Sequence, residues 1–170
     1  MDELAQRIKQ VAYLEGHFIL RSGKTSNYYL DKYLFETQPD ILRELAKRFC
    51  QYLDESIELI GGAELGGVPL AAAVSLESNL PFVIIRNKKK DYGTGKEFEG
   101  TDPKGKTILL VEDIATTGGQ VIEAANSLTE AGAKIKKIIA VIDRLEGARE
   151  NINNAGFEFD AIFTKESLGI

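Results

Sequence analysis

The sequence predicts an α/β fold in which a mostly parallel central sheet is flanked by helices. Three observations predict it. From about residue 57 onward, short β-branched and aliphatic runs alternate with segments of helical spacing. The run Ile108–Val111 is apolar throughout, as expected of a strand covered on both faces. A length of 170 residues, 44% of them hydrophobic, suits a single domain with one buried core.

The N-terminal part is expected to form a helix, a β-hairpin and a second helix. Asp2 is a candidate N-cap, and Leu4 and Ile8 begin an apolar stripe at helical spacing. Two short apolar runs flank a Ser- and Gly-containing turn, which is typical of a hairpin. The expected elements are a helix over 2–14 that Gly16 ends, strands at 18–20 and 28–30, and a helix from Pro39 to about residue 54.

Strands and helices then alternate to the end of the chain. We expect strands at 57–61, 81–85, 106–111, 137–142 and 157–163, helices at 69–78, 118–132 and 145–155, and a helical turn at 166–168. The interval 87–104 is polar and without periodicity. It is too long for a plain connection in a compact domain, so we interpret it as a functional lid.

The composition excludes several classes of site. One cysteine permits no internal disulfide, and one cysteine with one histidine cannot form a His/Cys zinc site. The net charge of −5 argues against a dedicated nucleic-acid binder. Neither a secretory signal nor a membrane-spanning apolar run is present. We therefore expect a cytoplasmic protein without nucleic-acid or membrane partners.

The charge is unevenly distributed along the chain. Residues 86–96 contain five basic residues and one acid, a local charge of +4, which leaves −9 for the remainder. A basic segment on an acidic body indicates a polyanionic ligand, because positioned cations stabilise a negatively charged leaving group. The alternative is an ordinary solvated surface loop.

The segment 108–120 combines an apolar strand, two acids, a Thr-Thr-Gly-Gly turn and a helix start. Strand ends in open α/β sheets deliver residues to a ligand crevice, and glycines let backbone amides approach a phosphate. Glu112 and Asp113 are placed to accept hydrogen bonds from sugar hydroxyls or to face a Mg²⁺ shell. The alternative is a tight strand–helix turn whose acids cap the helix.

Residues 108–120 resemble the 5-phosphoribosyl 1-diphosphate (PRPP) binding motif of type I phosphoribosyltransferases. Three further segments, 18–26, 86–95 and 141–144, resemble the hood signature, the catalytic loop and an orotate-binding strand end of orotate phosphoribosyltransferases. The resemblance implies one domain over 1–170, with a hood at about 1–35, a core at about 36–170 and a long flexible catalytic loop at about 87–104. It also implies a homodimer with shared active sites.

The resemblance further implies which residues form the site. The implied catalytic residues are Lys90, Glu112 and Asp113. PRPP contacts fall to Arg86, Asn87, Lys90, Tyr92, Glu112, Asp113, Ile114, Ala115, Thr116, Thr117, Gly118, Gly119 and Gln120. Orotate contacts fall to Arg21, Tyr29, Leu30, Thr116 and Arg144. The implied cofactor is Mg²⁺, bound mainly through PRPP near Glu112 and Asp113 and without a direct protein ligand.

The sequence departs from relatives at three positions. Asn87 stands where many have lysine, Tyr92 where many bacterial relatives have histidine, and Gly66 where some have lysine. A phenol donates a hydrogen bond but provides no imidazolium, so we assign Tyr92 to ligand contact rather than acid catalysis.

Two alternative functions share the fold. One is a purine phosphoribosyltransferase and the other is a PRPP-sensing regulator. Arg144 argues against the first, since a purine has no carboxylate for it to bind. No helix-turn-helix segment supports the second.

Overall fold

The computed structural model describes residues 2–19, 23, 25–87 and 97–170. Its strands are β1 (Tyr13–Ile19), β2 (Thr25–Leu30), β3 (Leu59–Ala63), β4 (Phe82–Ile85), β5 (Phe98–Gly100), β6 (Thr107–Ala115), β7 (Lys134–Asp143) and β8 (Phe159–Thr164). Its helices are α1 (Glu3–Ala12), α2 (Lys32–Glu36), α3 (Pro39–Cys50), α4 (Gly67–Ser78), α5 (Gly119–Glu130) and α6 (Ala148–Asn154), with a 3-10 turn η1 (Glu166–Leu168).

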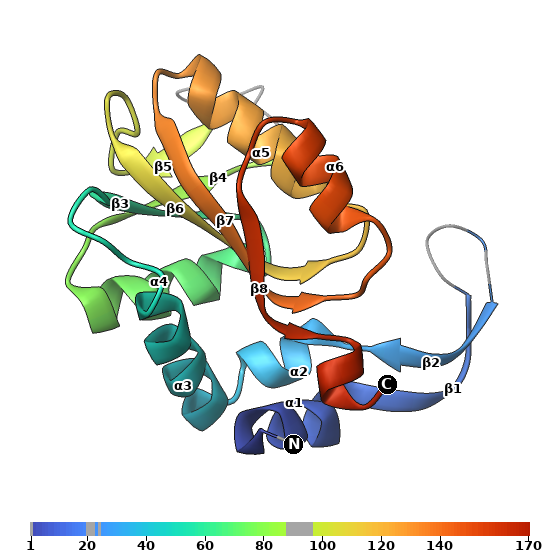
Figure 1. Ribbon diagram of the computed structural model, residues 1–170. Helices are drawn as coiled ribbons and strands as arrows, with labels where there is room; N and C mark the ends of the chain where they lie inside the picture. The colour runs from blue at the N-terminus through green and yellow to red at the C-terminus, as the bar shows by residue number, and fades with distance from the viewer. Residues whose placement is uncertain (1, 20–22, 24, 88–96) are drawn as a thin grey trace.

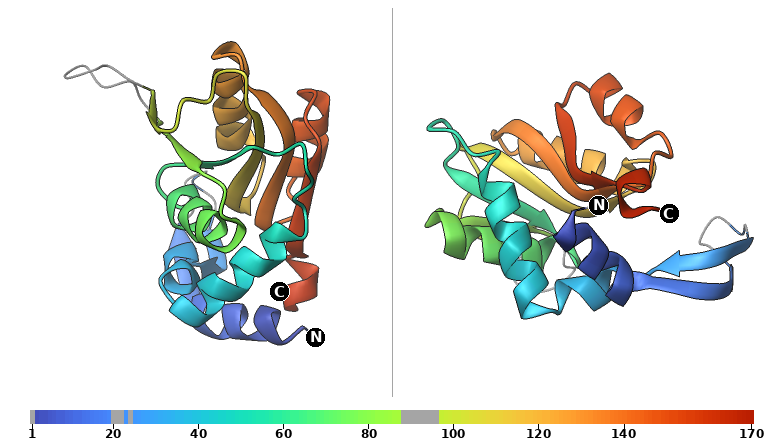
Figure 2. Two further views of the ribbon diagram at one scale, coloured as in Figure 1. Left: turned by 90° about the vertical axis from the view of Figure 1, so that its left-hand side faces the viewer. Right: turned by 60° about the horizontal axis from the view of Figure 1, so that its bottom comes forward.

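A six-stranded sheet of order β5-β4-β3-β6-β7-β8 forms the centre (Figure 1). All neighbouring pairs in it are parallel except β4 with β5. The antiparallel β1–β2 hairpin forms a separate sheet and projects from the body (Figures 1 and 2). The expected α/β class with a mostly parallel sheet is therefore confirmed.

The two faces of the sheet are covered by different helices. Along β6, Leu109 and Val111 pack into a cluster with α1, α3 and α4, whereas Ile108 and Leu110 pack into a cluster with α5 and α6. Successive side chains of a strand point to opposite faces, so burial on both faces explains the uninterrupted apolar run. Each such buried side chain stabilises the fold by roughly 1.5–3 kcal/mol relative to an exposed one.

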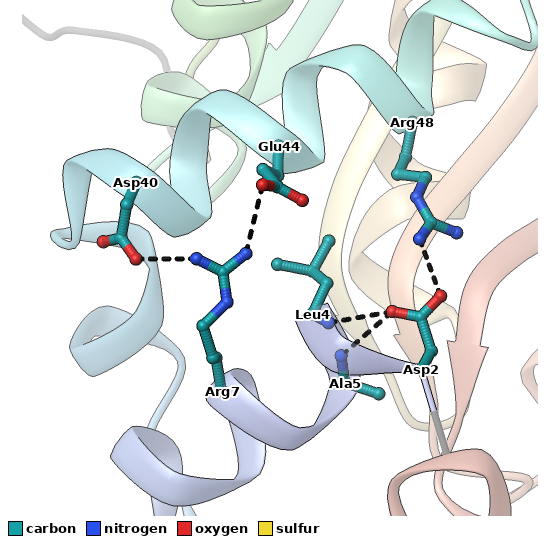
Figure 3. Close-up of polar contacts among 7 residues, drawn as sticks. All are labelled: Asp2, Leu4, Ala5, Arg7, Asp40, Glu44 and Arg48. Atoms are coloured by element: carbon teal, nitrogen blue, oxygen red, sulfur yellow. Dashed lines mark hydrogen bonds and ion pairs between the residues drawn. The ribbon is translucent and has the colours of Figure 1, made fainter.

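Helix α1 is oriented against α3 by ion pairs (Figure 3). The carboxylate of Asp2 caps the first turn of α1 and lies 2.6 Å from Nη2 of Arg48. Arg7 lies 2.9 Å from Asp40 and 3.3 Å from Glu44, both on α3. Exposed pairs contribute at most about 1 kcal/mol each, so the buried apolar face of α1 supplies most of the attachment.

The N-terminal expectation was wrong in two respects. The first helix ends at Ala12, and Gly16 lies within β1, because extended backbone begins at Tyr13, which pairs with Leu30. The predicted hairpin is confirmed, but it is longer than expected. Helix α2 was not expected at all; Asp31 caps it by accepting from the amide of Tyr33 at 3.1 Å.

The lid and the acid-bearing strand also differ from expectation. Part of 87–104 is not loop, because β5 pairs antiparallel with β4, and three residues are too few to show periodicity. The part of the predicted lid at 88–96 lies outside the described residues. Strand β6 does not end at Val111 but continues to Ala115, since Glu112, Ile114 and Ala115 pair with β7. The two acids therefore lie inside a strand.

The other predicted elements occur with shifted ends. Leu145 and Gly147 have positive φ values of 58° and 99°, so the expected helix over 145–155 starts only at Ala148. The predicted turn at 166–168 is confirmed as η1. Within the ranges that the structure describes, no helix has both the length and the apolar character that crossing a bilayer requires.

Candidate active site

A cavity of about 730 Å³ opens at the carboxyl end of β6, beside the start of α5. This edge is where open parallel sheets bind ligands. Ten of the predicted site residues line it: Tyr29, Glu112, Ile114, Ala115, Thr116, Thr117, Gly118, Gly119, Gln120 and Arg144. Sequence reasoning missed four further lining residues, Ile19, Val121, Glu123 and Glu146. The cavity thus joins β1 and β2, the β6–α5 turn and the end of β7.

The turn between β6 and α5 has the form of an anion site. Gly118 has a φ of 81°, and a Cβ there would lie 2.9 Å from Cγ1 of Ile152, so both conformation and space require glycine. Within the described structure, no side chain caps α5. The first amides of the helix are therefore free to donate to a ligand at its positive end. This finding contradicts the alternative in which Glu112 and Asp113 serve as helix caps.

Glu112 and Asp113 differ in exposure and in what they contact. Glu112 lines the cavity, whereas Asp113 is 2% exposed and faces α2, where Nζ of Lys32 lies 2.6 Å from its Oδ2. Burial, together with the negative charge of Asp113, raises the pKa of Glu112 well above its ordinary value. Asp113 thus lies behind the cavity wall and Glu112 forms part of it.

Arg144 presents a guanidinium to the cavity from the end of β7. Its Nη2 lies 3.0 Å from Oε1 of Glu146 and donates to the hydroxyl of Tyr28 at 3.4 Å. Its Cζ lies 5.8 Å from the centroid of the Tyr28 ring, which is stacked on Tyr13. The ring contact fixes the orientation of the guanidinium, whose planar donors suit a carboxylate.

Arg86 and Asn87 lie outside the cavity lining, at the base of the basic segment. The amide of Arg86 donates to the carbonyl of Glu97 at 2.9 Å, which joins the two ends of that segment. Asn87 donates twice to Glu64, from its backbone amide at 2.9 Å and from Nδ2 at 3.0 Å. The base of the basic segment is therefore attached to the loop that precedes α4.

The other predicted residues are placed as follows. Leu30 is buried among the α1–α4 cluster and does not line the cavity. Arg21, Lys90 and Tyr92 lie outside the described residues. Their roles stay predictions from the sequence.

Sequence reasoning also missed Lys32 and Glu36, which approach Asp113 from α2. A Cβ on Gly66 would lie 1.8 Å from Oδ2 of Asp113 and 3.1 Å from Oε1 of Glu36. Glycine at position 66 thus leaves the space that these carboxylates occupy. No local pattern could have revealed the cluster, because Lys32 and Asp113 are 81 residues apart in sequence.

Comparison with known proteins agrees with this geometry. The phosphoribosyl transferase domain matches residues 35–165. The orotate phosphoribosyltransferase of Pyrococcus horikoshii is 52% identical over 147 residues, which cover 85% of this chain and 79% of that protein. The orotate phosphoribosyltransferase of Halobacterium salinarum is 43% identical over 168 residues, covering 98% and 95%.

Solved structures show the same architecture. The orotate phosphoribosyltransferase of Aeropyrum pernix aligns with a TM-score of 0.85 and 27% identity over 97% of this chain and 95% of that one. The Mycobacterium tuberculosis enzyme in complex with PRPP aligns with a TM-score of 0.79 at 24% identity over 99% and 98%, which supports the fold. By its matched domain, by identities of up to 52% and by its fold, this chain belongs to the orotate phosphoribosyltransferase family.

Proposed function

We propose that this chain transfers the 5-phosphoribosyl group of PRPP to N1 of orotate. The products are orotidine 5′-monophosphate and diphosphate, and the reaction belongs to de novo pyrimidine biosynthesis. One observation carries the proposal: the cavity brings an uncapped helix start and the Arg144 guanidinium together in about 730 Å³. Sequence identity of up to 52% to orotate phosphoribosyltransferases supports it.

The cavity divides naturally between the two substrates. Amides and hydroxyls of 116–120 bind the 5′-phosphate of PRPP, and Glu112 accepts hydrogen bonds from the ribose hydroxyls. Arg144 binds the orotate carboxylate, and Tyr29 and Thr116 lie beside the pyrimidine ring. A purine would leave the guanidinium without an anionic partner, which disfavours a purine acceptor.

The residues of the chain catalyse the transfer by positioning and charge. The bond between C1 of the ribose and the diphosphate breaks with oxocarbenium character at C1, and N1 of orotate attacks from the opposite face, inverting C1. The proton that leaves N1 passes to the departing diphosphate or to solvent. Lys90, with Arg86, Asn87 and Tyr92 near it in sequence, stabilises the departing diphosphate. The loop excludes water, so that the ribosyl cation reacts with orotate rather than being hydrolysed.

Magnesium fits this site as a substrate-bound ion. Among the residues that the structure describes, no group of three His, Cys, Asp or Glu side chains could hold a metal. We propose that Mg²⁺ is bound through the oxygens of PRPP, near Glu112 and Asp113, since Mg²⁺ commonly binds through substrate phosphates. When bound, the ion neutralises charge on the diphosphate leaving group.

The acceptor can be tested by comparing bases. PRPP-dependent diphosphate release is measured with orotate, adenine, hypoxanthine and xanthine, each with Mg²⁺. We expect turnover with orotate alone. Turnover with a purine and none with orotate would overturn the proposal, and a protein that binds PRPP without any turnover would favour the regulator.

We propose in addition a homodimer whose basic loops serve the neighbouring subunit's site. Mixing Lys90→Ala subunits with Asp113→Asn subunits tests this arrangement. If sites are shared, heterodimers recover activity, because one of their two sites combines an intact loop with an intact acid pair. No recovery in heterodimers that form normally would show that each subunit completes its own site.

A further inference from the structure

Helix α2 places two ionisable side chains beside the site that the proposed mechanism does not use. Lys32 and Glu36 are four residues apart, so they lie on the same face of the helix. Lys32 reaches Asp113 with a nitrogen–oxygen distance of 2.6 Å, and Glu36 is 2% exposed. Glu36 is therefore buried behind the cavity wall, whereas Lys32 is half-buried beside it.

The two carboxylates and the ammonium meet where α2, the N-terminus of α4 and β6 converge. Oδ2 of Asp113 and Oε1 of Glu36 both lie next to the position that a Cβ atom at residue 66 would occupy. Oδ2 of Asp113 also accepts the hydrogen bond from Lys32. The ammonium of Lys32 thus pairs with Asp113, while Glu36 lies next to this pair in a buried position.

The protonation states of Lys32, Glu36 and Asp113 follow from their contacts and burial. Asp113 holds the ammonium and is the ionised acid, while neither oxygen of Glu36 has a hydrogen-bond partner among the described residues. A buried carboxylate without a partner is strongly disfavoured, so Glu36 retains its proton. Burial and the charge of Asp113 raise the pKa of Glu36 to about 8. Burial opposes the charge on Lys32, but the carboxylate of Asp113 outweighs it and raises the pKa of Lys32.

The ion pair is connected to the cavity through the backbone of β6. The amide of Asp113 donates to Oε1 of Glu112 at 3.3 Å, and its carboxylate accepts from the amide of Ile114. Glu112 and Ile114 both line the cavity, on either side of Asp113. The Asp113 carboxylate therefore holds the backbone of Ile114 directly, and the adjoining amide of Asp113 holds the side chain of Glu112.

We propose that Lys32 is a positioning residue for PRPP binding. Its ammonium fixes the carboxylate of Asp113, and through it Glu112 and Ile114 on the cavity side, while uncharged Glu36 encloses the pair. Lys32 touches neither substrate in this arrangement and acts through Asp113. The inference rests on the proposed function, in which Glu112 accepts hydrogen bonds from the ribose of PRPP.

The first experiment compares Lys32→Met with Lys32→Arg. Calorimetry measures the Kd of Mg²⁺–PRPP, and steady-state kinetics measure KM for PRPP and for orotate. We expect Lys32→Met to raise the Kd and KM for PRPP at least about tenfold and KM for orotate less than about twofold, because a buried acid loses its partner. Lys32→Arg keeps the positive charge, so its affinity for PRPP should be much closer to that of the wild type than the affinity of Lys32→Met. Lys47→Met, an exposed lysine on α3, is the matched control.

A double-mutant cycle tests whether Lys32 acts through Asp113. The effect of Lys32→Met on PRPP affinity should largely disappear in an Asp113→Asn background, because the group that Lys32 positions is already neutral. Additive effects, or a Lys32→Met protein with wild-type PRPP affinity, would overturn the inference. A loss shared equally between PRPP and orotate would indicate a purely structural role and would also overturn it.

A variant that does not fold and a failure of the proposed function can each be distinguished from a failure of the inference about Lys32. If Lys32→Met does not fold, Lys32→Gln, which keeps a polar group at this half-buried position, takes its place: PRPP affinity should fall and KM for orotate should stay unchanged, and an unchanged PRPP affinity overturns the inference. If the wild type binds PRPP but does not use orotate, the proposed acceptor fails while the PRPP comparison still decides the role of Lys32. A wild type that does not bind PRPP overturns both.

Discussion

Arg144 illustrates how the site depends on single side chains. It is held by the Tyr28 ring on one side and by Glu146 on the other, with its guanidinium at the cavity. Nη2 of Arg144 lies 3.0 Å from Oε1 of Glu146, so an anionic ligand would have to compete with this carboxylate. We predict that this guanidinium, oriented by Tyr28 and Glu146, sets the preference for an acceptor that carries a carboxylate.

Replacing Arg144 by alanine should affect one substrate only. We expect KM for orotate to rise at least about tenfold, since a charge-assisted pair is lost, with KM for PRPP within about twofold. Arg149→Ala on α6, which removes a more exposed arginine, is the control. Equal losses for both substrates would show that Arg144 does not bind the acceptor.

Replacing Lys90 by alanine should affect turnover. We expect kcat to fall on the order of 10²-fold, the effect of losing one charge contact made in the transition state, with an unchanged circular dichroism spectrum. Lys104→Ala, an exposed lysine outside the basic segment, is the comparison. Near-normal turnover of Lys90→Ala would refute the assignment of the basic segment.

The sequence could predict those site residues that are neighbours in one motif. Residues 114–120 lie together in the chain and in the cavity, so their pattern sufficed. It could not distinguish Glu112 from Asp113, because the strand was expected to end before both. Nor could it reveal Lys32, whose contact with Asp113 depends on how α2 packs against β6.

At the scale of elements, the contact between β3 and α4 sets the position of the loop that precedes α4. A Cβ on Gly62 would lie 2.2 Å from the carbonyl oxygen of Gly67, so the helix can approach the strand only over a glycine. Gly66, which makes room for Asp113 and Glu36, lies in the same connection. Close packing here therefore serves the acid cluster as well as the core.

The substitution Gly62→Ala should force β3 and α4 apart and destabilise the protein. We expect the free energy of unfolding to fall by about 2–3 kcal/mol in chemical denaturation, because backbone atoms must move to admit the methyl group. Gly119→Ala is the control, as the nearest atom to its Cβ would be 4.0 Å away. Its free energy of unfolding should change by less than about 0.5 kcal/mol. Equal effects of the two substitutions would refute the packing argument.

Elements with long periodic patterns were predictable, and elements defined by pairing or capping were not. The stripes of α1 and α3 and the apolar runs of β4 and β6 were visible in the sequence. Strand β5 exists because it pairs with β4, and α2 because Asp31 caps a single short turn. Neither cause produces a periodic pattern of apolar residues.

At the scale of the whole molecule, Glu36 couples folding to pH. Its pKa is about 8 in the folded protein against an ordinary value of 4.5. The folded state thus binds the proton more tightly, and the resulting stability is present below about pH 4.5 and is lost as pH rises towards 8. The Glu36→Gln protein has no ionisable group at this position, so it does not lose stability in this way as the pH rises.

The free energy of unfolding of Glu36→Gln, relative to wild type, should therefore rise between these pH values by up to roughly 1.4 kcal/mol per pH unit. The raised pKa of Glu112 acts in the same direction in both proteins, so the comparison isolates Glu36. Glu130→Gln, at the exposed end of α5, provides the matched control. Parallel pH profiles of wild type and Glu36→Gln would contradict the assignment of a neutral, buried Glu36.

The identity of the product tests directly whether this protein transfers the phosphoribosyl group to orotate. The protein is incubated with PRPP, orotate and Mg²⁺, and the nucleotide formed is separated and identified by mass and by the NMR signature of its glycosidic linkage. We expect orotidine 5′-monophosphate, linked through N1 and inverted at C1, in equal amount to diphosphate. Diphosphate released without this nucleotide, or no reaction with orotate at all, would contradict it.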